Sequence, residues 1–154
     1  MPKMSDISKI CAVASDGAGF KLKEVVKSYL TELGYEVTDC GTDSDASCDY
    51  PDFAVKCCKE IVEGRAGFGI LCCGTGVGMS MAANKVKGIR AACCSDTFSA
   101  RATRSHNDAN VLCIGERVVG YGLAKELVDA FINTPFEGGR HQRRVDKVME
   151  IENS

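Results

Sequence analysis

The sequence predicts an α/β fold, a Rossmann-like three-layer sandwich with a five-stranded parallel sheet and a C-terminal helix. Three features of the chain indicate this fold. Short apolar runs alternate with longer segments of helical periodicity. Several runs are apolar throughout, as in strands that are buried on both faces of a sheet. The 154 residues, of which 45% are hydrophobic, suffice for one domain over residues 1–154, and no repeat or linker indicates a second.

Five segments have the composition of parallel strands. The first, KICAVAS, is apolar and bounded by polar residues, and the third, FGILCC, leads directly into a glycine-rich turn. We expect strands over residues 9–15, 35–40, 68–73, 89–94 and 111–115.

Helical segments separate these strands and carry end signals. Gly34 and Gly64 follow the first two helices as stops, and Pro51 fits the first turn of the second. Ser95 or Asp96 can cap the fourth helix. The final helix has an apolar side that needs a packing partner, such as another subunit. We expect helices over residues 20–33, 51–62, a short stretch to about 85, 97–106, 123–132 and 140–152.

This order of elements also predicts where a ligand binds. In parallel α/β sheets the binding site lies at the carboxyl ends of the strands. The residues expected at that edge are Asp16, Cys73, Gly74, Asp96 and Gly115.

Composition excludes several classes of protein. The net charge of −2 provides no general field for nucleic acid or an anionic membrane. The polar residues 1–8 do not resemble a signal peptide, so we expect a cytoplasmic location. Because the chain shows no secretion signal and carries its own apolar core, we expect its ten cysteines to be reduced thiols. Three pairs of these cysteines are adjacent rather than spaced as Cys-x-x-Cys, so we expect no structural metal.

The strongest local signal is the turn that begins at Cys73 and continues through Gly74, Thr75, Gly76, Val77 and Gly78. Glycines allow a tight turn whose N–H groups can point at an oxygen anion, and the following helix adds its positive end. A thiolate at Cys73 could then remove a carbon-bound proton while the N–H groups hold the enediolate. Spacing alone also fits a merely buried cysteine, the interpretation adopted for Cys11, Cys57 and Cys93.

The same turn raises a dinucleotide hypothesis, since three glycines follow a strand and Asp96 stands about 20 residues further on. The spacing is G-x-G-x-G, however, and lacks the third glycine of the fingerprint. Asp96 also fits a helix cap, and a chain of 154 residues leaves little room for a substrate domain.

Two further segments carry polar side chains suited to a phosphosugar. Arg140 and Arg144 lie one helical turn apart, a geometry that suits a phosphate, although a solvated basic end is the commoner case. His106 is one of two histidines and could move protons near neutral pH, and a structural role fits it equally well.

Together these segments resemble the type B ribose-5-phosphate isomerase family, which also includes galactose-6-phosphate isomerase subunits. The resemblance covers nearly the whole chain. It rests on SDGAGF, DYPDFA, the long block GILCCGTGVGMSMAANKVKGIRAA, SHNDANVL, GERVVG and EGGRHQRRV, in this order.

The resemblance implies interconversion of ribose 5-phosphate and ribulose 5-phosphate without metal or organic cofactor. It implies that Cys73 is the base with Thr75 beside it, and that His106 is the acid that opens the sugar ring. It also implies homodimers or tetramers with sites built from two subunits. The implied sugar contacts are Asp16, Gly17, Tyr50, Asn107 and the turn residues Gly74, Gly76, Val77 and Gly78. The implied phosphate-binding residues are Arg117, Arg140 and Arg144.

Gly17 departs from the family pattern, which usually has histidine at this position. The missing donor would cost about 1–3 kcal/mol of phosphate binding, and we expect a wider site at Gly17. We therefore expect either weaker binding of ribose 5-phosphate or preference for another phosphosugar. Such a sugar could be a ketohexose, tetrulose, allose or galactose phosphate. A non-catalytic phosphosugar-binding domain and a nicotinamide oxidoreductase are the other hypotheses.

Overall fold

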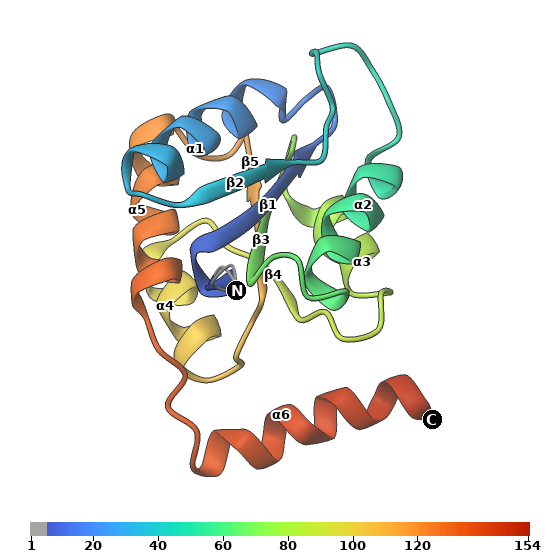
Figure 1. The fold of residues 1–154 in the computed structure, drawn as a ribbon, viewed down its shortest axis with the longest axis vertical. Coiled ribbons are helices and arrows are strands. Elements are labelled where there is room, and N and C mark those ends of the chain that lie inside the picture. Colours follow the sequence, from blue (N-terminus) through green and yellow to red (C-terminus); the bar gives the residue numbers. More distant parts are fainter. Residues whose placement is uncertain (1–5) are drawn as a thin grey trace, which may run out of the picture.

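The computed structural model describes residues 6–154 and contains one five-stranded parallel sheet between two layers of helices (Figure 1). Part of the polar start of the chain, residues 1–5, lies outside the described residues. The sheet order is β2-β1-β3-β5-β4, so the predicted fold class is confirmed. The strands are β1 (Ile10–Ser15), β2 (Glu36–Asp39), β3 (Phe68–Cys73), β4 (Ala91–Cys93) and β5 (Val111–Gly115).

The strand register brings the carboxyl ends of the central strands together. Ser15 of β1 lies opposite Cys72 of β3, and Cys73 lies opposite Gly115 of β5. The chain moves outward from β1 to β2 and then returns to the other side of β1 to form β3. The gap between β1 and β3 is therefore the topological switch point, where ligands of such sheets bind.

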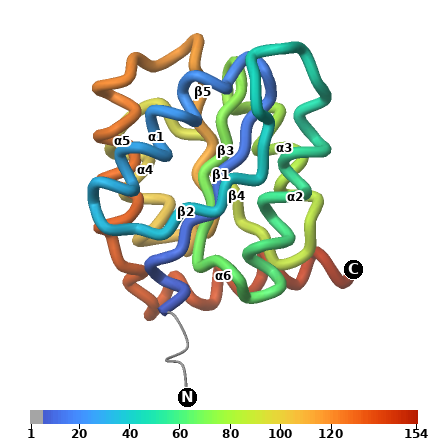
Figure 2. Tube along the Cα trace, turned by 45° about the horizontal axis from the view of Figure 1, so that its top comes forward, coloured from blue at the N-terminus to red at the C-terminus, as the bar shows by residue number. Residues whose placement is uncertain are grey.

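The helices form one layer on each face of the sheet, as Figures 1 and 2 show. Leu22, Ala100 and Leu127 belong to the core of the first face, while Ala54 and Met79 belong to the core of the second. The first face is covered by α1 (Phe20–Glu32), α4 (Thr97–Ser105) and α5 (Tyr121–Asn133). The second face is covered by α2 (Tyr50–Val62) and α3 (Val77–Ala83). Among residues 6–154 we find no helix with the length and apolar character that crossing a bilayer requires.

The predicted end signals act as expected. Gly34 and Gly64 both have positive φ, the conformation that ends a helix most easily at glycine. Pro51 lies in the first turn of α2. The Asp96 carboxylate accepts a hydrogen bond of 2.7 Å from the Ser99 N–H, so Asp96 is the cap of α4.

Strand β4 is shorter than the predicted segment 89–94. Before it, the Arg90 N–H donates to the side-chain oxygen of Asn110 at 2.8 Å. A side chain thus replaces the strand partner at Arg90, and β4 begins at Ala91 instead of at residue 89.

The C-terminal helix α6 (Arg140–Glu150) lies outside the two layers, across the end of the molecule where β4 and β5 begin (Figure 1). The Glu152 carboxylate, just beyond it, accepts a hydrogen bond of 2.9 Å from the Gly88 N–H. Val145 is buried, whereas Val148 and Ile151 remain exposed. The predicted apolar side is therefore only partly covered by its own chain.

Candidate active site

Cys73 ends β3 at the switch point and is 5% exposed. Gly76, whose φ of +82° suits glycine, directs its N–H at the Cys73 sulfur over 3.1 Å. A donor that faces the sulfur favours the thiolate over the thiol. Burial raises the pKa of Cys58 to about 12 and that of Cys94 to about 11.

The glycine-rich turn contains Thr75 and approaches Tyr50 at Gly78. The Thr75 hydroxyl oxygen accepts a 3.2 Å hydrogen bond from the Val77 N–H and lies on the exposed side of the turn. A Cβ at Gly78 would lie 2.7 Å from the ring of Tyr50, so only glycine lets the tyrosine rest against the start of α3. Tyr50 itself is the first residue of α2.

Asp16 and Arg117 complete this edge. The Asp16 carboxylate accepts a 3.0 Å hydrogen bond from the Gly19 N–H, and Gly19 is packed against the backbone of Cys72. The Arg117 N–H donates to the Gly74 carbonyl at 3.0 Å. We call Asp16, Tyr50, Arg117 and the turn Cys73–Gly78 the thiol cluster.

The expectation of extra space at Gly17 is wrong. A Cβ at Gly17 would lie 2.2 Å from the carbonyl oxygen of Ala46 and 2.6 Å from that of Asp45. The backbone of the connection between β2 and α2 therefore occupies the position where a side chain of residue 17 would begin. The environment of Gly17 is closed by two hydrogen-bond acceptors rather than open.

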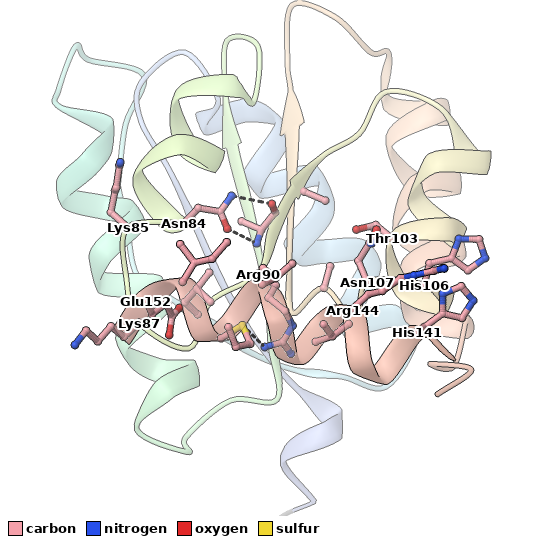
Figure 3. Close-up of a pocket in the computed structure, with 18 residues that line it drawn as sticks. Asn84, Lys85, Lys87, Arg90, Thr103, His106, Asn107, His141, Arg144 and Glu152 are labelled. Atoms are coloured by element: carbon pink, nitrogen blue, oxygen red, sulfur yellow. Dashed lines mark hydrogen bonds between the residues drawn. The ribbon is translucent and has the colours of Figure 1, made fainter. Parts of the chain in front are cut away.

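The remaining predicted residues lie elsewhere. His106, Asn107 and Arg144 line a cavity of about 870 Å³ between α6 and the body of the protein (Figure 3). Arg140 is the first residue of α6 and directly precedes His141, which also lines this cavity. His106 directly follows α4, at the end opposite to the Asp96 cap.

His141 and Glu137 join this group, and the motif analysis assigned neither of them a role. The imidazoles of His106 and His141 are stacked, with 4.4 Å between ring centroids and 12° between planes. The Glu137 carboxylate lies 3.4 Å from His106 Nε2 and 3.9 Å from His141 Nε2. Burial of its ring, and then the charges of Arg140 and His106, lower the pKa of His141. We call His106, Asn107, Glu137, Arg140, His141 and Arg144 the histidine cluster.

The sequence contained one signal for this grouping. His106 and His141 are the only histidines in the chain. The 34 residues between them gave no reason to expect the two histidines close together, because strand β5, helix α5 and their connections intervene.

The thiol and histidine clusters lie at opposite ends of the strands. The thiol cluster is at the carboxyl ends and the histidine cluster is at the amino ends. His106 and Asn107 precede the start of β5, whereas Cys73 is level with its last residue, Gly115. Four steps along a strand cover about 13 Å, so one chain does not bring His106 to Cys73. Of the predicted phosphate-binding residues, Arg117 belongs to the thiol cluster, and Arg140 and Arg144 belong to the histidine cluster.

A polar, glycine-rich turn with a thiol at the switch point defines a parallel α/β protein with a small-molecule site at its carboxyl edge. Comparison with known proteins agrees. Residues 11–148 match the family described as Ribose/Galactose Isomerase. Ribose-5-phosphate isomerase B of Escherichia coli is 49% identical over 144 residues, which are 94% of this chain and 97% of that protein.

Two further relatives extend the comparison. D-erythrulose-4-phosphate isomerase of Pectobacterium atrosepticum is 44% identical over 138 residues, which are 89% of this chain and 91% of that protein. The structure of ribose-5-phosphate isomerase B from Clostridium thermocellum matches with a TM-score of 0.93 and 49% identity, over 94% of this chain and 97% of that one. The chain therefore belongs to the ribose/galactose isomerase family of sugar-phosphate isomerases.

Proposed function

We propose that the protein interconverts ribose 5-phosphate and ribulose 5-phosphate, with Cys73 as the base. The observation that carries the proposal is the 3.1 Å hydrogen bond from the Gly76 N–H to the Cys73 sulfur at the switch point. It supports a thiolate at the edge of the sheet where small ligands bind.

The chemistry follows from this position. The Cys73 thiolate removes the proton from carbon 2 of the open-chain aldose and returns it to carbon 1. The hydroxyl proton moves from oxygen 2 to oxygen 1, so the carbonyl shifts without net oxidation. Backbone N–H groups of the turn Gly74–Gly78 stabilise the negative oxygen of the enediolate, and Thr75 lies beside the reacting carbons.

The histidine cluster supplies the other half of the site from a second copy of the chain. His106 opens the sugar ring as an acid, with Asn107 on a sugar hydroxyl, and Arg140 and Arg144 bind the phosphate. Asp16, Gly17, Tyr50 and Arg117 complete the pocket from the first copy. The support for a homodimer is the separation of the two clusters within one chain and the partly uncovered apolar side of α6.

A second candidate substrate is another phosphosugar, and Gly17 favours it. Two carbonyl oxygens stand beside this residue, and it has no side chain to donate a hydrogen bond to a phosphate. Acceptors of this kind suit a sugar hydroxyl better than a phosphate oxygen. A relative at 44% identity is a D-erythrulose-4-phosphate isomerase, so a tetrulose phosphate belongs in any substrate panel.

We place this activity in the cytoplasm as part of carbohydrate metabolism and the pentose phosphate pathway. Support comes from the cysteines, all ten of which are free thiols, as expected in a reducing compartment.

Isotope exchange tests the proposal. The protein is incubated in deuterated water with ribose 5-phosphate, allose 6-phosphate, galactose 6-phosphate and D-erythrulose 4-phosphate, and each sugar is followed by NMR. We expect interconversion of ribose 5-phosphate and ribulose 5-phosphate with solvent deuterium at the reacting carbons.

The Cys73→Ala variant should lower kcat by about 10²–10⁴-fold, the usual contribution of a positioned general base. Cys72→Ala is the matched control, since the neighbouring thiol is fully buried in β3. Undiminished activity in a folded Cys73→Ala protein would remove this residue from the mechanism.

A further inference from the structure

The histidine cluster has a feature with no part in the proposed isomerisation. Three of its side chains, those of His106, Glu137 and His141, place potential metal-ligand atoms close together. Each offers one ligand atom, and these three atoms lie within 4.8 Å of one another. Two imidazole nitrogens and one carboxylate oxygen form a donor set typical of zinc and related transition-metal ions. Figure 3 shows the two imidazole rings side by side at one end of α6.

A second observation points to a ligand at this position. His141 is 6% exposed, and its Nε2 atom has no hydrogen-bond partner among the described residues. A buried polar atom without a partner is unfavourable, and such atoms usually indicate a missing water, ion or ligand. The unpartnered nitrogen is the one on the side of Glu137.

The backbone holds the three residues in this arrangement. The Glu137 N–H donates to the Ser105 carbonyl at 3.1 Å, which fixes the segment before α6 against the end of α4. His106 directly follows α4, and His141 is the second residue of α6. The ligands thus come from the end of α4, the segment before α6 and the first turn of α6, and not from one loop.

Coordination requires the three donor atoms, which lie within 4.8 Å of one another, to move closer together. With bonds of about 2.0–2.1 Å in a tetrahedral site, neighbouring donor atoms lie about 3.3 Å apart. The 3.4 Å between His106 Nε2 and Glu137 already agrees with this value, and the 3.9 Å to His141 Nε2 is longer by about half an ångström. The nearly parallel rings must also tilt so that their lone pairs converge on one ion.

Solvent access favours the binding of a metal ion here, whereas the nearby positive charges oppose it. The side chains of His106 and Glu137 are 46% and 54% exposed, so an ion reaches them from solvent. The positive charges of Arg140 and Arg144 act on His141 and weaken its affinity for a cation.

We propose that His106, Glu137 and His141 bind one divalent transition-metal ion of the zinc type, with an open fourth position for water. The bound ion occupies His106 and thereby inhibits isomerisation, a consequence that rests on the function proposed above. The ion is an inhibitor at this site and not a cofactor of the reaction.

Metal titration of the untagged, metal-free protein tests the site directly. Cobalt(II) is the probe, because its visible absorption reports the geometry and the donor atoms. We expect one cobalt ion per chain, without the near-ultraviolet bands of cobalt–thiolate bonds, and displacement by zinc.

Variants separate this site from the thiols. Glu137→Gln and His141→Gln should each weaken binding at least tenfold, whereas Glu126→Gln on the exposed side of α5 and Cys93→Ser at the exposed thiol should not change it. Absence of binding, or loss of binding in Cys93→Ser instead of Glu137→Gln, overturns the proposal.

Activity is the second readout, taken relative to each protein without metal. Zinc at the concentration that displaces cobalt should abolish most isomerisation by the unaltered protein and much less of that by Glu137→Gln. Equal inhibition of both proteins contradicts the proposed link to His106. If the metal-free protein isomerises no sugar, the proposed function fails, while the cobalt titration still decides the metal site.

Discussion

At the scale of single residues, the chain distinguishes one thiol from the others by its hydrogen bond. Cys57 donates its thiol proton to the Ala12 carbonyl at 3.4 Å, and burial raises its pKa well above the ordinary value. Cys73 instead accepts a hydrogen bond from Gly76. The two buried cysteines therefore differ in hydrogen bonding, since the Cys57 thiol is a donor and the Cys73 sulfur is an acceptor.

Gly17 gives a prediction about stability at this scale. In Gly17→Ala the new Cβ meets the carbonyl oxygens of Ala46 and Asp45, which are backbone atoms, so the connection between β2 and α2 must shift. We expect a loss of about 1–3 kcal/mol in the free energy of unfolding, measured with urea.

Gly122→Ala is the matched control, since among residues 6–154 its added Cβ meets no atom within 4 Å outside its chain neighbours and its own helix backbone, and Gly122 is in the first turn of α5. This variant should gain up to about 1 kcal/mol. If Gly17→Ala were as stable as the original protein, the predicted close contact between Gly17 and the connection from β2 to α2 would be contradicted.

Individual positions show what sequence reasoning reaches and what it does not. Cys73 was identifiable because a strand end and a glycine-rich turn adjoin it in the chain. The contact between Gly17 and Ala46 was not, because it depends on how a connection almost 30 residues away folds back. The chemistry of a residue could be predicted from its neighbours in the sequence. The steric fit between segments that are distant in the sequence could not.

At the scale of elements, a buried charge joins α1 to the end of β2. Lys23 is 1% exposed, and its ammonium donates to Asp39 at 2.8 Å and to the Thr42 carbonyl at 2.6 Å. Burial alone would raise the pKa of Asp39, but hydrogen bonds from Lys23, Gly41 and Lys27 outweigh it, and the net effect lowers the pKa.

Asp39→Asn should therefore destabilise the protein by about 3 kcal/mol at pH 7, because it leaves a buried ammonium without its carboxylate. Lys23→Met should cost less, since it removes the buried charge and Asp39 keeps Lys27 at 3.0 Å. Urea unfolding of the three proteins measures both effects.

The pH dependence has a definite sign. Since the folded-state pKa of Asp39 is lowered, its contribution is fully present above the unfolded value of about 4 and is lost as pH falls through the folded value. The difference between the original protein and Asp39→Asn should shrink below pH 4. A difference that stays constant from pH 7 to pH 3 would contradict the ion pair as its cause.

The elements themselves were largely predictable. The segments 68–73 and 111–115 form the central strands with the predicted bounds, because unbroken apolar runs in a parallel sheet leave little choice of register. Edge strand β4 is shorter than predicted, since the side chain of Asn110 replaces a backbone partner. The position of α6 was not predictable, as its apolar side could have packed on several surfaces.

At the scale of the whole molecule, the two clusters lie at opposite ends of the strands. The carboxyl edge holds Cys73, and the opposite edge holds His106, Arg140 and Arg144. Sequence motifs did not predict this separation, because they give the order of residues along the chain and not their distances in space. Only the family resemblance implied a site shared between subunits, and the register of β3 with β5 gives that expectation a physical reason.

Complementation between two inactive variants tests this central claim most directly. Cys73→Ala and His106→Asn are purified, mixed in equal amounts, unfolded in urea and refolded together, and ribose 5-phosphate isomerisation is measured. If each site takes Cys73 from one copy and His106 from the other, random pairing leaves about one site in four intact. We predict almost no activity for either variant alone and about a quarter of the original activity for the mixture. A refolded mixture no more active than its separate components would contradict a site built from two copies.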